Sequence, residues 1–313
     1  MRKIAGFILL AILCSAGAGV ASEPGEGLVP LKRIFRSDRQ IGYLSWKPVD
    51  FRKAVRAGFN TVWIGIGPFV ALSSEEQEGM VRRAMEADLK ILGFIGGDPS
   101  WARQDRRSGS KHAVQEYRQL LHALGRLAQE MDLGYLRFAF AVDVEPHTQG
   151  WWEGDLAGYS ELLKMRILPM VEEFAQEHPW RVARPMLTRF EPFWWENGHV
   201  TESGRVIRGL QDFPSGIASM TYRNNALELE EVSRQVRQRA KRAPGVVYLL
   251  GVETKPAGPG IPSYITFHGR VRQIGRELQR AIEAMPPEDR TRLRGVFVHA
   301  GRDYADEVLD QLD

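Results

Sequence analysis

The sequence predicts a single (β/α)8 barrel, because short apolar runs alternate with longer segments of helical periodicity, eight of each, along 313 residues. A doubly wound open sheet is the alternative. It usually has fewer strands and a glycine-rich first turn, and no G-x-G-x-x-G motif follows the first predicted strand. We therefore expect a signal peptide over residues 1–22, a linker over residues 23–38 and one barrel domain over residues 39–313.

The predicted strands are short runs rich in apolar and β-branched residues. They are Ile41–Trp46, Thr61–Ile66, Ile91–Gly96, Phe138–Glu145, Pro185–Phe190, Gly216–Tyr222, Val246–Glu253 and Gly295–His299. The predicted helices repeat apolar residues every three or four positions. They are Val49–Ala57, Ser73–Asp88, His112–Met131, Asp155–Glu177, Glu202–Asp212, Ala226–Arg242, Phe267–Met285 and Tyr304–Leu312.

Capping residues support two of these helix boundaries. Gly58 follows the helix that ends at Ala57, where a left-handed residue is favoured. Ser73 precedes Glu75 and Glu76, which provides a hydroxyl cap and acidic residues at the positive end of the helix dipole. The boundaries therefore agree with the periodicity.

The N-terminus has the pattern of a secretory signal peptide. Arg2 and Lys3 precede the apolar run Ile4–Leu13, and small residues follow over Ser15–Ser22. An uncleaved N-terminal anchor is the alternative. Cleavage would remove the single cysteine, Cys14, and leave 40 basic and 39 acidic residues of the original 42 and 39. We expect a periplasmic or secreted protein without disulfides, and the balanced charge does not favour nucleic acid as a partner.

The stretch Phe138–His147, FAFAVDVEPH, begins as a buried strand and ends in two carboxylates. Alternate residues of a barrel strand face the lumen and the surrounding helices. Phe138 and Phe140 therefore belong to the helix-facing set, and Asp143 and Glu145 to the lumen-facing set at the C-terminal mouth. Active sites of barrel enzymes lie at this mouth.

The seventh predicted strand ends in the same way, with Glu253 on the face of Leu249 and Gly251. Two carboxylates around a cleft are the requirement of glycoside hydrolysis: one protonates the leaving oxygen and the other attacks or activates water. We expect Glu145 to be the general acid/base, with a pKa raised by Asp143 and partial burial, and Glu253 to be the nucleophile. The alternative is that each glutamate pairs with an arginine and only ties loops together.

These strand-end acids resemble the clan of retaining barrel glycosidases, which carry the acid/base on the fourth strand and the nucleophile on the seventh. An Asn normally precedes the acid/base there, and Val144 stands in its place. Asp143–Val144–Glu145 and Met220–Thr221–Tyr222 also resemble motifs of the chitinase family, in which they hold an N-acetyl sugar. That resemblance implies that Asp143 shares a proton with Glu145 or steadies an N-acetyl group, in which case Glu253 only binds substrate. The whole chain is also similar to secreted bacterial barrels without an assigned activity.

Other residues at the predicted mouth are candidates for substrate binding. Flat aromatic rings stack on sugar faces, and polar side chains bind hydroxyl groups. Packing of loops, a tight turn at Asp98 and an ion pair between Arg189 and Glu191 are the structural alternatives. The predicted binding residues are Trp46, Asp98, Trp101, Trp152, Arg189, Glu191, Trp194, Tyr222 and His299; Trp151 and Trp195 are neighbouring rings.

We expect no cofactor and no metal, because no H-x-H follows the first strand and no H-E-x-x-H occurs. Asp143, Glu145 and His147 are an alternative metal set, but Pro146 disturbs their register. The function expected is an exported, monomeric glycoside hydrolase acting on a polysaccharide or cell-envelope glycan. The rivals are a non-catalytic carbohydrate-binding pseudoenzyme on the same barrel, and a barrel lyase that would use Lys255 or Arg189.

Overall fold

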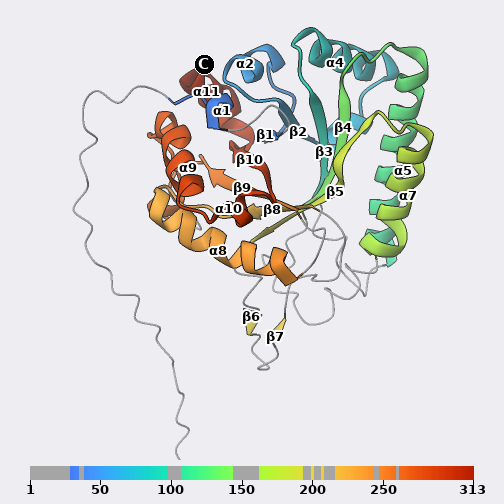
Figure 1. Cartoon of the computed structure of the whole chain (residues 1–313). Coiled ribbons are helices and arrows are strands. Elements are labelled where there is room, and N and C mark those ends of the chain that lie inside the picture. Colours follow the sequence, from blue (N-terminus) through green and yellow to red (C-terminus); the bar gives the residue numbers. More distant parts are fainter. Residues whose placement is uncertain are drawn as a thin grey trace, which may run out of the picture.

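The computed structural model describes residues 29–34, 39–97, 107–143, 162–192, 199–200, 206–207, 216–242, 247–258 and 261–313. These residues confirm the predicted (β/α)8 fold: eight parallel strands close into a barrel in the order β1-β10-β9-β8-β5-β4-β3-β2, surrounded by helices (Figure 1). The barrel strands are β1 Gln40–Trp46, β2 Thr61–Gly65, β3 Ile91–Gly96, β4 Arg137–Val142, β5 Val182–Pro192, β8 Gly216–Met220, β9 Val247–Glu253 and β10 Leu293–His299. All eight predicted strands are confirmed, with β4 ending at Val142.

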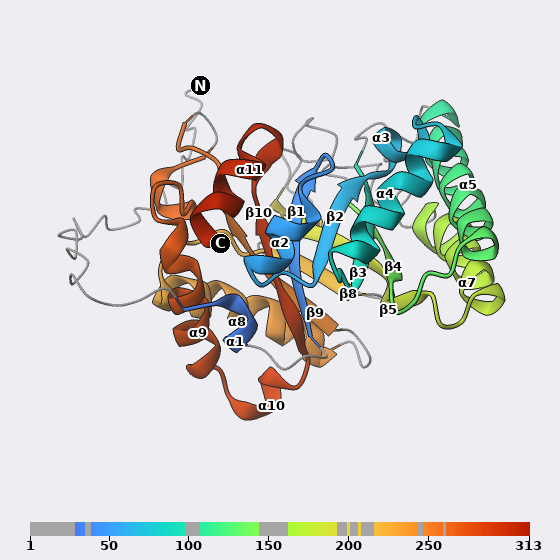
Figure 2. The same cartoon turned by 90° about the horizontal axis from the view of Figure 1, so that it is seen from above.

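The helices lie on the outside of the barrel, and α5 and α7 are neighbours in both views (Figures 1 and 2). The helices are α1 Leu31–Ile34, α2 Phe51–Arg56, α3 Ile66–Val70, α4 Ser74–Glu86, α5 Arg107–Glu130, α7 Leu168–Glu177, α8 Ala226–Arg242, α9 Ile274–Glu283, α10 Pro287–Arg290 and α11 Gly301–Leu312. A π-helix at Leu163–Ile167 precedes α7, and short 3-10 turns at Ser263–Ile265 and Val271–Gln273 precede α9. None of the described helices is long and apolar enough to cross a membrane.

The predicted caps form as expected. The Ser73 hydroxyl accepts from the backbone N–H of Glu76, whose carboxylate accepts from the backbone N–H of Ser73. Gly58 has a φ of 95°, the left-handed geometry that favours glycine after a helix. These local signals therefore fix the ends of α2 and α4.

The predicted helix Phe267–Met285 begins later in the structure, at Ile274, and two other predicted segments differ in kind. The predicted helix Glu202–Asp212 is wrong at Val206–Ile207, which forms β7 and pairs antiparallel with β6, His199–Val200. The β-branched residues of both segments favour a strand over a helix. Within the predicted linker, Leu31–Ile34 forms α1, and Leu31 is buried in the core because its side chain packs beneath the barrel helices.

Large rings fill the barrel interior opposite glycines. Trp63 contacts Phe190 edge to face, and Phe190 contacts Phe297 in the same way, with ring centroids 5.8 and 4.8 Å apart. A Cβ at Gly93 would lie 2.3 Å from the Trp63 ring, and a Cβ at Gly251 would lie 2.1 Å from the Phe297 ring. The glycines therefore provide the space that the rings occupy.

The alternation predicted for the fourth strand is confirmed. Ala139 and Ala141 belong to the interior cluster with Trp63 and Phe297, whereas Phe138 and Phe140 belong to the core beneath the helices. Apolar side chains thus occupy most of the middle of the barrel.

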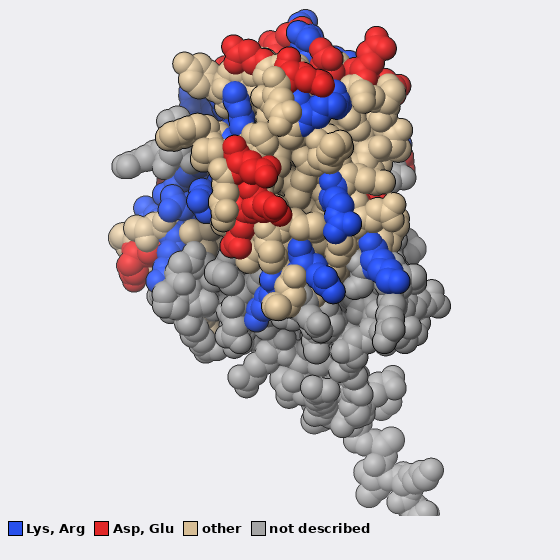
Figure 3. Space-filling model, turned by 90° about the vertical axis from the view of Figure 1, so that its right-hand side faces the viewer, with Lys and Arg blue, Asp and Glu red and all other residues tan. Residues whose placement is uncertain are grey.

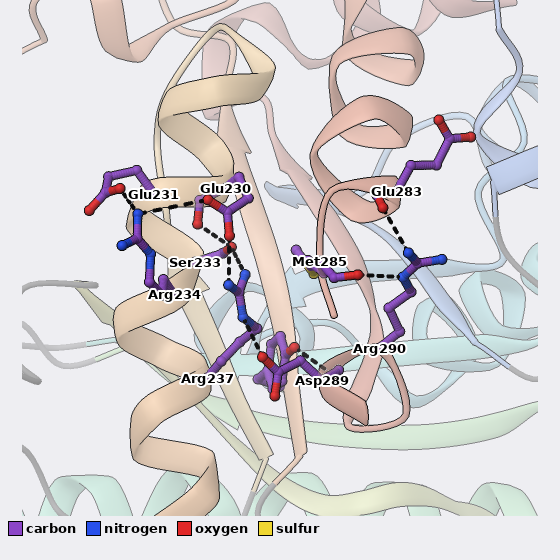
Figure 4. Close-up of polar contacts among 10 residues, drawn as sticks. Glu230, Glu231, Ser233, Arg234, Arg237, Glu283, Met285, Asp289 and Arg290 are labelled. Atoms are coloured by element: carbon purple, nitrogen blue, oxygen red, sulfur yellow. Dashed lines mark hydrogen bonds and ion pairs between the residues drawn. The ribbon is translucent and has the colours of Figure 1, made fainter. Parts of the chain in front are cut away.

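A buried ion-pair network joins α8 to the segment before β10 (Figure 4). The guanidinium of Arg237 pairs with Asp289 at 3.0 Å and with Glu230 at 2.6 Å, and it also donates to the Ser233 hydroxyl. The Tyr248 hydroxyl donates to the backbone carbonyl of Asp289. The side chains of Arg237 and Asp289 are 4% and 6% exposed, so water cannot replace their contacts.

Replacing Arg237 with Met is expected to lower the free energy of unfolding by about 3–5 kcal/mol, because Asp289 loses its buried ion pair. Arg234 on the same helix is the matched control, since its side chain is 50% exposed and pairs with Glu230 and Glu231 at the surface. Arg234→Met should cost about 1 kcal/mol or less. Urea unfolding of the two variants measures the difference, and equal losses would contradict the prediction.

Candidate active site

The C-terminal ends of β8, β9 and β10 bring three predicted site residues together. Glu253 ends β9, His299 ends β10, and Tyr222 follows β8. Glu253 and His299 face each other in the register of the two strands. Since Gly251 and Phe297, two residues earlier on each strand, meet in the barrel interior, Glu253 and His299 lie on the lumen side.

Glu253 is a buried carboxylate held on both oxygens. Its Oε1 accepts hydrogen bonds from the backbone N–H groups of Thr254 and Lys255, at 2.8 and 2.9 Å. Its Oε2 lies 3.0 Å from His299 Nδ1 and 3.9 Å from Lys255 Nζ. The residue is 3% exposed, so these contacts replace its hydration.

These contacts decide the charge of Glu253. Burial by itself raises the pKa of the carboxyl, but the charge and hydrogen bond of His299, the charge of Lys255 and the backbone N–H of Lys255 outweigh burial. The resulting pKa lies below the usual range for glutamate. Glu253 is therefore an ionised carboxylate at neutral pH, as a nucleophile requires.

The ionised Glu253 determines that Nδ1 of His299 carries a proton. Nδ1 lies 3.0 Å from Glu253 Oε2 and 3.1 Å from the Tyr222 hydroxyl oxygen, and the imidazole and phenol rings stack. Because a carboxylate has no proton to donate, Nδ1–H is the donor and the phenol oxygen shares that proton. Nε2 lies on the other side of the ring, and this buried atom has no hydrogen-bond partner among the described residues.

Threonine hydroxyl groups hold the surrounding backbone. Thr254 Oγ1 donates to the His299 carbonyl at 2.8 Å, and Thr266 Oγ1 donates to the Lys255 carbonyl at 2.6 Å. The Thr221 hydroxyl donates to the Gly251 carbonyl and accepts from its N–H. These threonines could not be predicted from the sequence, because a lone hydroxyl residue after a strand has no distinctive pattern.

A pocket of about 560 Å3 lies next to this group and includes both Trp46 and Lys255. A Cβ at Gly97 would lie 2.5 Å from the Trp46 ring and 3.0 Å from the Asp143 carbonyl, so the ring covers the ends of β3 and β4. Trp46 thus spans from the Asp143 side of the mouth to the Lys255 side. The other lining residues are Pro256, Gly258, Ile261, Gly301, Asp303 and Tyr304.

Arg189 is not brought to the lumen side. It is 1% exposed and pairs in register with Val142 and Ile217, which both belong to the core beneath the helices. The neighbouring residue Phe190 faces the interior. Glu191 pairs with Ser219 of β8. Strand alternation therefore places Arg189 on the helix-facing side, which corrects its predicted position at the mouth.

The remaining predicted site residues lie outside the described residues, and so do Trp151, Trp195 and His147 of the alternatives. They are Asp98, Trp101, Glu145, Trp152 and Trp194. Among the described residues, no group of three or more His, Cys, Asp or Glu side chains could hold a metal ion.

No protein-family model and no curated protein matches this chain. Solved structures do match. A family GH18 chitinase from Cycas revoluta in complex with allosamidin is 13% identical with a TM-score of 0.50, covering 88% of this chain and 96% of that one. The likeness is one of fold.

Two further matches have the same character. A GH18 chitinase from Pseudoalteromonas aurantia is 12% identical with a TM-score of 0.48, covering 88% of this chain and 100% of that one. A thermostable mutant of a xylanase from Cellvibrio japonicus is 12% identical with a TM-score of 0.47, covering 86% and 88%. Both likenesses are again ones of fold.

The charge of Glu253 predicts a pH dependence of stability. Its pKa is lower in the folded protein than in the unfolded chain, where a glutamate has a pKa of about 4.3. The ionised carboxylate stabilises the folded state above that pH, and this contribution is lost as the pH falls through the folded-state pKa. The difference in unfolding free energy between the wild type and Glu253→Gln should therefore shrink as the pH falls from neutral to below about 4.3. A constant difference in chemical denaturation over this range would contradict the assignment.

The tautomer of His299 is a second prediction. Nitrogen-15 NMR of the neutral ring should show the proton on Nδ1, because that proton is the one that ionised Glu253 can accept. Glu253→Gln should weaken this preference, and comparison with the spectrum of His299→Gln assigns the signal. A proton on Nε2 in the wild type would mean that Glu253 does not orient the ring.

Proposed function

We propose that the protein is an exported glycoside hydrolase that cleaves a polysaccharide or cell-envelope glycan. The observation that carries the proposal is the ionised, buried Glu253 on the lumen side at the end of the seventh barrel strand. A fixed carboxylate in this position suits attack on, or stabilisation of, the positive anomeric carbon in the transition state. The signal-like N-terminus supports export.

In this proposal Glu145 is the general acid/base. The chain reaches the same rim at Asp143, whose backbone N–H donates to the Gly96 carbonyl, and Glu145 follows two residues later. Asp143 shares a proton with Glu145 or steadies an N-acetyl group. In the second case the substrate's own acetamido group attacks and Glu253 binds rather than reacts.

His299 and Trp46 are proposed to bind the substrate. Nε2 of His299 is a buried nitrogen without a described partner, and a sugar hydroxyl, which can both donate and accept a hydrogen bond, would satisfy it. Trp46 provides a flat ring beside the pocket that Lys255 lines, and such a ring stacks on the apolar face of a sugar. Tyr222 contacts substrate through the ring that stacks on His299.

A carbohydrate-binding protein without catalysis is the second candidate function. It is favoured by the 3% exposure of Glu253 and by the internal contacts of both its oxygens. A carboxylate held in this way stabilises the ends of β9 and β10 whether or not it reacts. The two functions differ in one observable: a hydrolase cleaves a glycosidic bond of the glycan, whereas a binding protein only binds the glycan.

Release of reducing sugar from a panel of envelope and secreted polysaccharides tests the proposal. Glu145→Gln and Glu253→Gln should each lower kcat by a factor of about 10²–10⁴, because each removes a group that acts in the transition state. Loss with Glu145→Gln alone would indicate the substrate-assisted route. Binding of a glycan with no release of sugar would contradict the hydrolase and support the second candidate.

Glu86→Gln is the matched control for these variants. Glu86 ends the outer helix α4, just before the N-terminal end of β3, and its side chain is 51% exposed and 3.4 Å from Arg52. The substitution makes the same change of charge away from Glu253, so the activity should remain that of the wild type. A similar loss in all three variants would mean that overall charge or folding, rather than the site, explains the effect.

A further inference from the structure

The N-terminal ends of β3, β4 and β5 place three cationic residues in a row. The backbone N–H of Arg137 donates to the Lys90 carbonyl at 3.0 Å, and the backbone N–H of Phe138 donates to the Arg181 carbonyl at 2.6 Å. Lys90, Arg137 and Arg181 therefore lie on adjacent strands about 4.8 Å apart, a row of about 10 Å. This row is at the opposite end of the barrel from Glu253.

The row borders a pocket of about 630 Å3, which also includes Arg39 at the start of β1. Two aromatic residues of the same pocket extend into solvent. Tyr135, in the turn before β4, is 89% exposed, and Trp180, in the turn before β5, is 84% exposed. We call these six residues the cationic pocket: Arg39, Lys90, Tyr135, Arg137, Trp180 and Arg181.

Few carboxylates balance this charge. Lys90 pairs with Asp88, and the carboxylate of Asp132 accepts from the backbone N–H of Gly134. Arg181 donates to the Gly134 carbonyl, and Arg39 donates to the Arg290 carbonyl. The side chain of Arg137 makes no hydrogen bond or ion pair with another described residue. Like charges on adjacent strands repel one another and destabilise the folded state. A bound anion would reduce this electrostatic repulsion.

Positive charge is concentrated at the cationic pocket rather than over the whole molecule. The face of the molecule on the side of α5 and α7 carries both acidic and basic side chains (Figure 3), and the whole chain has a net charge of only +3. Neighbouring cations around a concavity therefore indicate a site, rather than the general character of a basic protein.

We propose that the cationic pocket binds an acidic polysaccharide, a chain of sugar rings that carries carboxylate or sulfate groups. Guanidinium groups pair with both of these anions through two parallel hydrogen bonds. The exposed rings of Tyr135 and Trp180 provide flat faces for sugar rings, and the row is longer than one small anion. A bilayer is flat, and it would not fill a pocket between strand ends.

The site binds without cleaving, because the row holds no described carboxylate other than those already bonded. It would keep the protein on an acidic polymer while the opposite end of the barrel remains open to substrate. The inference stands independently of the proposed hydrolase, since none of its residues belongs to the Glu253 site.

Isothermal titration calorimetry with polygalacturonate, and with neutral dextran as the uncharged comparison, tests the proposal. The wild type should bind polygalacturonate and not dextran, and Glu253→Gln should bind as the wild type does. Arg137→Ala and Trp180→Ala should each weaken binding by about tenfold. Arg137→Ala should also reduce the dependence of affinity on salt, whereas Trp180→Ala should not.

Arg166→Ala is the matched control, because Arg166 is an exposed arginine in the π-helix before α7, at the far end of that helix from Trp180. It should leave the affinity unchanged. Equal weakening by Arg137→Ala and Arg166→Ala would show an effect of overall charge and overturn the site. Equal binding of dextran would overturn the requirement for an anion. Tighter, Arg137-dependent binding of single-stranded DNA or of phosphatidylglycerol vesicles would overturn the polysaccharide as the ligand.

Discussion

The filled interior of the barrel is the constraint on which the other features depend. The centre holds three rings in edge-to-face contact, those of Trp63, Phe190 and Phe297. Gly93 and Gly251 have no side chain, and the rings fill the space that a Cβ would need there. Since these rings fill the layer, the ionisable inward-facing residues Glu253 and His299 lie above it, where each is a partner for the other. The packed interior therefore separates the polar groups at the C-terminal end of the barrel from those at the N-terminal end.

At the C-terminal end, this separation gives Glu253 its properties. The position two residues after Gly251 is the first on β9 that faces the lumen above the aromatic layer. It is still 3% exposed, so an isolated charge would be costly there. His299, Lys255 and two backbone N–H groups remove that cost and keep the pKa of the carboxyl low. The same contacts that stabilise the strand ends thus produce an ionised group facing the mouth.

Most of the barrel could be predicted from the sequence because its signals are local. Alternation in Phe138–Val142 and the capping pattern at Ser73 depend on residues close in the chain, and both are confirmed. Arg189 was misplaced because its position near the end of β5 indicates the mouth, whereas the next residue, Phe190, faces the interior, and adjacent residues of a strand face opposite sides. The pair Val206–Ile207 was misread because two apolar residues fit a helical period as well as a short strand.

Less of the site than of the fold could be predicted from the sequence. Strand-end position was enough to bring Glu253, His299 and Tyr222 together, since parallel strands share one rim. The threonine contacts and the tautomer of His299 depend on distances of about 3 Å between segments far apart in the sequence, which no periodicity encodes. The cationic row has the same origin: Lys90, Arg137 and Arg181 are more than forty residues apart in sequence, and become neighbours through the register of β3, β4 and β5. A barrel that closes in parallel therefore creates side-chain groups at both of its ends, and the charge of each group is decided by which residues begin or end the strands.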